Sequence, residues 1–137
     1  MRKLCSTAAL GVVALALLGA GAGRADIADC GGSNVEMTAC IWEHYEAADA
    51  ELNALWPEVL AVIDGSSDIM PASALSDWRA GLIKAQRAWA EFKEADCNIA
   101  VAHEWYGGSG ASAAIGSCLY EHTQDRIEEL RARYLER

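Results

Sequence analysis

The sequence predicts an all-α protein, an antiparallel three-helix bundle stapled by two disulfides, and three observations support this fold class. Apolar residues recur in steps of three and four over three long stretches, and no stretch alternates as a β-strand would. Turn-forming residues separate the stretches, and short connections make consecutive helices antiparallel. Beyond the first 25 residues the chain keeps four cysteines, an even number typical of a small exported domain with disulfides.

The first 25 residues have the pattern of a secretory signal peptide. A basic start precedes the apolar run 10–20, which is too short to cross a bilayer with margin, and no stop-transfer pattern follows it. Small residues then allow cleavage after Ala22 or after Ala25. We expect the later site to be used, so that residues 26–137 form one helical domain without membrane insertion.

The first helix is expected to begin at Ser33. Ser33 and Glu36 have the spacing of a capping box, in which each side chain bonds the other residue's backbone amide. Pro57 lacks an amide hydrogen and crowds the preceding turn, so a kink or a fresh helical start is expected near Trp56. One apolar stripe should face the core; it comprises Ile41, Tyr45, Ala48, Leu52, Leu55, Val59 and Val62.

The second helix follows a connection at residues 64–71 and should run from about Ala72 to about Cys97. The pattern then dissolves over residues 98–110, whose glycine-rich end disfavours a helix, so this is the longest predicted loop. The inward stripe of the second helix comprises Leu75, Trp78, Leu82, Ala85, Trp89 and Phe92. The third helix should start near Ser109 or Ser112 and carries Ile115, Leu119, His122, Ile127, Leu130 and Tyr134.

An antiparallel bundle gathers all four cysteines, Cys30, Cys40, Cys97 and Cys118, at one end. Three pairings are possible, of which we favour Cys40 with Cys118 and Cys30 with Cys97. Metal ligation is the competing interpretation, and it is disfavoured because the chain contains no C-x-x-C pair. His122 follows Cys118 by four residues and shares its helical face, but a disulfide would use that thiolate. The prediction is therefore four disulfide cysteines and no metal.

The charge is strongly negative. The whole chain carries −9, and the chain without its first 25 residues keeps 8 basic against 20 acidic side chains, a net charge of −12. Such a balance disfavours nucleic acid and anionic membranes as partners and favours a cationic protein, although acidity also keeps an exported protein soluble.

Sequence motifs for catalysis remain incomplete. His103 and Glu104 begin an H-E-x-x-H zinc motif, but Gly107 stands where the second histidine is needed. Gly108, Ser109 and Gly110 resemble part of a nucleophile elbow, yet no strand precedes them. Acidic residues are too numerous to single out a catalytic pair. We therefore expect no enzyme activity and no cofactor.

The predicted loop is the candidate partner-binding surface. Trp105 and Tyr106 stand beside a glycine-rich turn, where exposed aromatic residues would mark a contact surface, although burial is the commoner fate of tryptophan. The candidate partner-binding residues are His103, Glu104, Trp105, Tyr106, Gly107, Gly108 and Ser109.

Several motifs together resemble the LprI-like lysozyme-inhibitor domain. They are Met37-x-x-Cys40, Asp49-x-x-Leu52-Asn53, Gln86-Arg87-Ala88-Trp89-x-x-Phe92-Lys93-x-x-x-Cys97, Gly107-Gly108-Ser109 and Cys118-x-x-x-x-Thr123-x-x-Arg126-x-x-x-Leu130. The resemblance implies a helical domain with disulfides in the bacterial envelope, some of whose relatives inhibit lysozyme. Lys93 departs from the arginine often found there, and the lipid-attachment cysteine of the lipoprotein members is missing.

The polar motif residues are expected to hydrogen-bond between helices or to cap the neighbouring loop rather than contact a partner; they are Asp49, Asn53, Gln86, Thr123 and Arg126. The leading hypothesis is a periplasmic or secreted protein that binds a cationic lysozyme and occludes its cleft. The alternative is a helical adaptor module that binds a different envelope partner and leaves lysozyme active.

Overall fold

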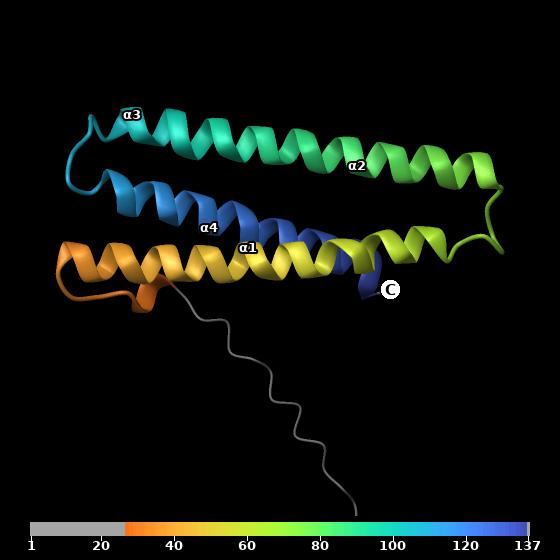
Figure 1. Cartoon of the computed structure of the whole chain (residues 1–137), viewed down its shortest axis with the longest axis horizontal. Coiled ribbons are helices and arrows are strands. Elements are labelled where there is room, and N and C mark those ends of the chain that lie inside the picture. The colour runs from red at the N-terminus through yellow and green to blue at the C-terminus, as the bar shows by residue number, and fades with distance from the viewer. Residues whose placement is uncertain (1–26, 137) are drawn as a thin grey trace, which may run out of the picture.

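The computed structural model describes residues 27–136, which form helices and no strand. Three long helices dominate: α1 (Asn34–Asp64), α2 (Ala72–Ala95) and α4 (Ala111–Leu130). They run antiparallel in turn, and α1 packs most extensively against α4 (Figure 1). The predicted bundle is therefore confirmed, whereas the predicted signal peptide lies outside the described residues.

Short helical pieces extend the long helices. A 3-10 turn, η1 (Ile27–Asp29), precedes α1, and the π-helix η3 (Arg131–Leu135) continues α4. The π-helix η2 (Asp96–Val101) and the short α3 (Ala102–Glu104) continue α2. None of the helices within residues 27–136 combines the length and apolarity that crossing a membrane requires.

The capping box at the start of α1 is confirmed. The Ser33 amide donates to Glu36 Oε2 at 2.8 Å, and the Glu36 amide donates to Ser33 Oγ at 3.3 Å. The Ser33 side-chain and backbone hydrogen bonds also lower the pKa of Glu36 from its ordinary value. The helix continues through Pro57 to Asp64, so of the two expected outcomes, a kink or a fresh helical start, the fresh start is wrong. Burial of Leu55 and Val59 on either side of the proline holds the helix against the core.

The main hydrophobic core lies between α1, α2 and the C-terminal part of α4. Its members are Leu52, Leu55, Val59, Ile63, Leu82, Ile127, Leu130 and Tyr134. The predicted stripe on α1 belongs to this core only from Leu52 to Val59, and Ile63 is fully buried in place of Val62. The earlier stripe residues lie outside the main core; they are Ile41, Tyr45 and Ala48.

The predicted inward face of α2 is wrong at its C-terminal end. Phe92 is 54 % exposed, whereas the neighbouring Lys93 is 7 % exposed. The buried positions Lys93 and Cys97 are one helical turn apart, so they face α4 together. Phe92 therefore lies at the exposed edge of this contact. There its ring meets the edge of His122 at a centroid distance of 5.2 Å.

The predicted loop at residues 98–110 is much shorter than expected. Helical structure continues through η2 and α3, which leaves only residues 105–110 between α3 and α4. The segment before Gly107 contains no glycine or proline, so the helix continues as far as Glu104, shortly before the glycines.

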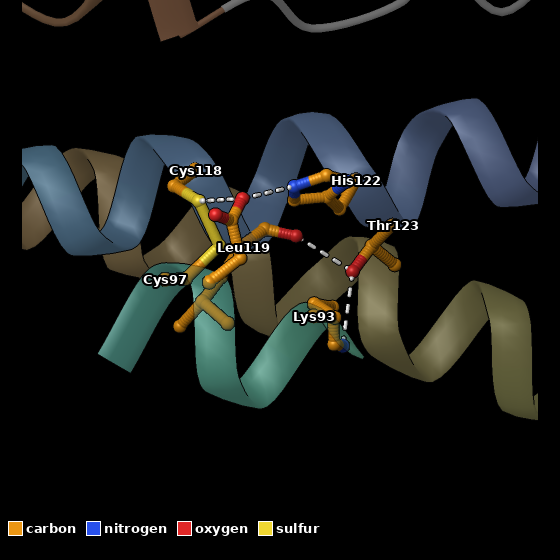
Figure 2. The surroundings of a disulfide bond; sticks show 7 residues. Lys93, Cys97, Cys118, Leu119, His122 and Thr123 are labelled. Atoms are coloured by element: carbon orange, nitrogen blue, oxygen red, sulfur yellow. Dashed lines mark hydrogen bonds and ion pairs between the residues drawn. A yellow bond between two sulfur atoms is a disulfide. The ribbon is translucent and has the colours of Figure 1, made fainter. Parts of the chain in front are cut away.

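The favoured disulfide pairing is wrong. The bonds join Cys30 to Cys40 and Cys97 to Cys118, with Cα atoms 5.7 and 5.6 Å apart. The first is local, because η1 lies back against the start of α1 (Figure 1). The second is formed because Cys97, on η2, faces α4 (Figure 2). Each bond therefore joins neighbouring elements, and the two bonds link consecutive pairs of cysteines along the sequence.

Candidate partner-binding site

A buried polar junction crosses the bundle near its middle. The Lys93 ammonium donates to Thr123 Oγ1 at 3.2 Å and lies 3.7 Å from Asp49 Oδ1. It also lies over the rings of Trp89 and Tyr45, at 4.9 and 5.2 Å from their centroids. The junction therefore ties the three long helices together at one level.

Burial changes the acid–base behaviour of this junction. Loss of hydration lowers the pKa of the Lys93 ammonium, against the opposing effect of Asp49. Burial, with the charges of Asp49 and Glu94, raises the pKa of the Tyr45 phenol. Both shifts favour neutral side chains.

The remaining polar motif residues continue this network. Asn53 donates to Asp49 Oδ2 at 2.9 Å along α1. Arg126 donates from Nε to Gln86 Oε1 at 2.8 Å, which links α4 to α2, and it also pairs with Glu129. All five polar motif residues thus make contacts within the bundle, four of them between helices.

The junction divides the described residues into two halves of different charge. We define the loop half as residues 27–48 and 94–122, and the distal half as residues 50–92 and 124–136. The distal half contains ten Asp or Glu and six Lys or Arg residues. The loop half contains no Lys or Arg and eight acidic residues, of which all but Asp96 are exposed: Asp29, Glu36, Glu43, Glu46, Glu94, Asp96, Glu104 and Glu121.

Two exposed aromatic side chains stand at the tip of the loop half. Trp105 is 49 % exposed, so its expected burial is wrong, and Tyr106 is 96 % exposed. Tyr106 has φ of 48°, a left-handed conformation that is uncommon for a bulky residue, and Gly107 follows with φ of 70°. The turn therefore presents the tyrosine away from the bundle at some backbone cost.

The loop that carries these residues is held at both ends. The Gly108 backbone amide donates to the Trp105 carbonyl at 2.7 Å, and the Asn34 side-chain amide donates to the Ser109 backbone carbonyl at 2.8 Å. Gly110 lies under the Trp105 ring, since a Cβ there would come within 2.4 Å of Cζ3. The loop is thus fastened to α1 and packed on its own tryptophan, which gives the surface a defined shape.

All seven predicted partner-binding residues are exposed and lie together at this end of the bundle (Figure 1). His103 and Glu104 belong to α3, and the others form the connection to α4. Val35 and Ile99, which were not among the predicted site residues, are also 78 % and 58 % exposed in the same half. Their exposure could have been anticipated, because both fall outside the apolar stripes.

An open groove of about 430 Å³ between α2 and α4 lies in the distal half. Trp78 stacks on Tyr134 along it, with ring centroids 6.2 Å apart. Arg126 and Arg133 also line the groove, and both pair with Glu129. Its basic groups therefore already have an anionic partner.

The chain matches the family model described as Lysozyme inhibitor LprI over residues 28–130. It is also similar to an uncharacterized protein of Rhizobium meliloti (strain 1021), with 35 % identity over 105 residues that cover 72 % of each chain. No solved structure matches it. The chain therefore belongs to the LprI lysozyme inhibitor family, which is a family of inhibitors and not of enzymes.

Proposed function

We propose that this member of the LprI family is an exported binding protein that inhibits a cationic lysozyme by covering its substrate cleft. The observation that carries the proposal is the loop half, where exposed aromatic side chains stand on a surface without a single lysine or arginine. The protein performs no chemistry in this proposal; it acts by occupying the space that the substrate needs.

The charge distribution supports a cationic partner approached from one end. Eight acidic residues without a compensating cation create a negative field at the loop half, whereas six cations offset the acids of the distal half. Such a field steers a positively charged protein and raises its association rate, an effect that salt screens.

The exposed aromatic residues support a desolvated contact at the tip of that half. Tyrosine and tryptophan are the residue types most enriched among those that dominate binding energy, and they lose few rotatable bonds on binding. Tyr106 is the more exposed of the two aromatic residues, and Trp105 directly precedes it in the same turn.

Export is supported by the covalent structure. Both disulfides would be reduced in a cytosol that keeps thiols free, whereas they persist in the periplasm or outside the cell. We therefore place the protein in the periplasm or the extracellular medium.

Lysis of bacterial cell walls by lysozyme tests the proposal. The purified protein should slow lysis in a saturable manner, and the Tyr106→Ala variant should need about 30-fold more protein for the same inhibition, as expected for a residue that contributes about 2 kcal/mol. Ile69→Ala is the matched control, because Ile69 is 82 % exposed in the distal half, and it should inhibit as the unchanged protein does.

The electrostatic part has its own control pair. Replacing Glu104 by Gln should weaken inhibition more at low salt than at high salt, whereas Glu58→Gln in the distal half should have little effect at either. Undiminished lysis at an excess of protein would refute inhibition and leave an adaptor for another envelope partner. Equal effects of the Tyr106 and Ile69 substitutions would refute the placement of the site.

A further inference from the structure

Beyond the proposed function, the surroundings of one disulfide contain a complete set of metal ligands. Asp96, Cys97, Cys118 and His122 offer four ligand atoms that all lie within 4.8 Å of one another. We propose that reduction of the Cys97–Cys118 bond converts this cluster into a binding site for a thiophilic divalent cation, of which Zn²⁺ is the type.

The distances suit a tetrahedral ion. His122 Nε2 lies 3.0 Å from Asp96 Oδ2, and Cys118 Sγ lies 3.9 Å from the same oxygen. Ligand atoms around tetrahedral zinc lie about 3.3–3.8 Å apart, as metal–ligand bonds of about 2.0–2.3 Å require. The Nε2–Oδ2 distance falls just below this range and the Sγ–Oδ2 distance just above it, so small side-chain rotations would adjust both. The two sulfur atoms are much too close because they are bonded, and breaking that bond lets them separate (Figure 2).

The fold positions each ligand independently of the disulfide. Cys118 and His122 are four residues apart on α4 and share one face of that helix. Asp96 and Cys97 begin η2, a π-helical stretch of the kind often found at functional sites. One turn away, Lys93 donates to Thr123 Oγ1, which itself donates to the Leu119 carbonyl (Figure 2). These bonds hold α2 beside α4 when the covalent link is absent.

The site also has an entrance. The side chains of His122 and Asp96 are 29 % and 40 % exposed, whereas Cys97 is fully buried. A cation would meet the imidazole and the carboxylate first and the buried Cys97 thiolate last. The eight acidic residues of the loop half attract cations to this end of the bundle.

The redox step balances with a dithiol as the reductant. The dithiol supplies two electrons and two protons, the S–S bond breaks, Cys97 and Cys118 become thiols, and the dithiol becomes a disulfide. Binding of Zn²⁺ then releases the two thiol protons to water, since thiolates are the ligands. The disulfide and the bound metal exclude one another, so the site exists only in the reduced protein.

The second disulfide provides an internal comparison. Cys30, Cys40 and His44 also bring three ligand atoms together, and within residues 27–136 no fourth histidine, cysteine or acidic residue joins them. We therefore expect tight binding only at the four-ligand cluster, at one cation per chain.

Titration with Co²⁺ as a spectroscopic probe tests the proposal. The purified protein is reduced with a phosphine, which takes an oxygen atom from water as the thiols form and leaves no competing thiol. The reduced protein should bind one equivalent of Co²⁺, with thiolate charge-transfer absorption and tetrahedral visible bands that Zn²⁺ abolishes, and the oxidised protein should show neither.

Variants assign the ligands. Cys97→Ser should weaken the charge-transfer absorption, and His122→Gln and Asp96→Asn should each lower the affinity at least about tenfold. His44→Gln and the double variant Cys30→Ser with Cys40→Ser are the controls and should leave the spectrum unchanged. Circular dichroism follows the helices: if reduction unfolds the chain, restoration of helix by Zn²⁺ supports the site.

Three results would overturn the proposal. The first is that the reduced protein, folded or unfolded, binds no Co²⁺. The second is that the Co²⁺ spectrum is unchanged by both His122→Gln and Asp96→Asn. The third is that the spectrum is lost in the Cys30 and Cys40 double variant. Lysozyme inhibition does not enter any of these readouts, so the outcome is independent of the proposed function.

Discussion

The two halves of the bundle are held together by different means. Every member of the main hydrophobic core belongs to the distal half, whereas both disulfides belong to the loop half. The loop half buries a few apolar side chains, such as Ile41, Leu119 and Tyr120, but none of them joins that core. The disulfides therefore lie in the half where hydrophobic packing contributes least to stability.

The same contrast appears in the charges. Arginines of the distal half pair with acids there, as Arg79 does with Asp64 and Arg131 with Glu51. Among the described residues, the loop half has no arginine or lysine to do the same, so its acidic side chains repel one another. A surface suited to a cationic partner is thus costly to the free protein, and the disulfides offset that cost by restricting the unfolded chain.

The largest expected effect of a single substitution lies in the distal core. Leu130 is fully buried, so Leu130→Ala should lower the free energy of unfolding by about 2–5 kcal/mol, through lost burial and the cavity left behind. Urea denaturation followed by circular dichroism measures it.

Leu135→Ala is the matched control for this measurement. Leu135 lies five residues further on and is 37 % exposed, so its truncation should cost less than about 1 kcal/mol. Equal losses for the two leucines would mean that the distal core is not the main source of stability.

Loss of the α2–α4 disulfide should have the next largest effect. It closes a loop of sequence separation 21, so replacing Cys97 and Cys118 together by Ala should cost about 3 kcal/mol in the chain-entropy account. Hydrogen exchange should show faster opening in the loop half than in the distal half, since only the former loses its constraint. Uniform acceleration throughout the bundle would contradict the division into halves.

The sequence predicts much of the fold, because most of the helices are determined by local sequence patterns. The capping box at Ser33 and the stripe from Leu52 to Val59 involve neighbours along one helix, and both are confirmed. Disulfide pairing depends on how separate elements meet. Knowing that all four cysteines lie at one end left three pairings open, and the π-helical turn that aims Cys97 at α4 has no sequence pattern of its own.

The face of α2 was mispredicted for a physical reason. A rule that turns apolar residues inward selects Phe92 and rejects Lys93, but the structure buries the lysine. Two aromatic rings, a hydroxyl and a carboxylate compensate the buried ammonium, and these groups come from three different helices. Likewise, the glycines of the exposed loop locate it in the sequence. The charge asymmetry around the loop depends on which helix ends lie together, and the sequence alone does not give that arrangement.

Removing one partner of the junction between the halves should have a moderate effect. Asp49→Asn leaves the buried Lys93 ammonium without its anionic partner and should cost about 1–3 kcal/mol of unfolding free energy. Lys93→Met removes the buried charge instead and should change stability by less than about 1 kcal/mol, because Thr123 still donates to the Leu119 carbonyl. Urea denaturation of both variants separates the two cases. A larger loss for Lys93→Met than for Asp49→Asn would identify the lysine as a net stabiliser of the boundary.

The smallest expected effect concerns an ion pair of the distal half and depends on pH. Burial raises the pKa of the Glu129 carboxyl, but hydrogen bonds from Arg133 and Arg126 outweigh it, so the folded-state pKa lies below its ordinary value of about 4.5. The unfolded chain therefore binds the proton first, and the stabilisation is complete above about pH 4.5 and disappears as pH falls through the folded-state pKa. Because Glu129 is 44 % exposed, Glu129→Gln should cost less than about 1 kcal/mol at pH 7, and high salt or a pH near 3 should shrink that difference. A difference that grows as the solution is acidified would mean that burial, rather than the two arginines, controls this carboxylate.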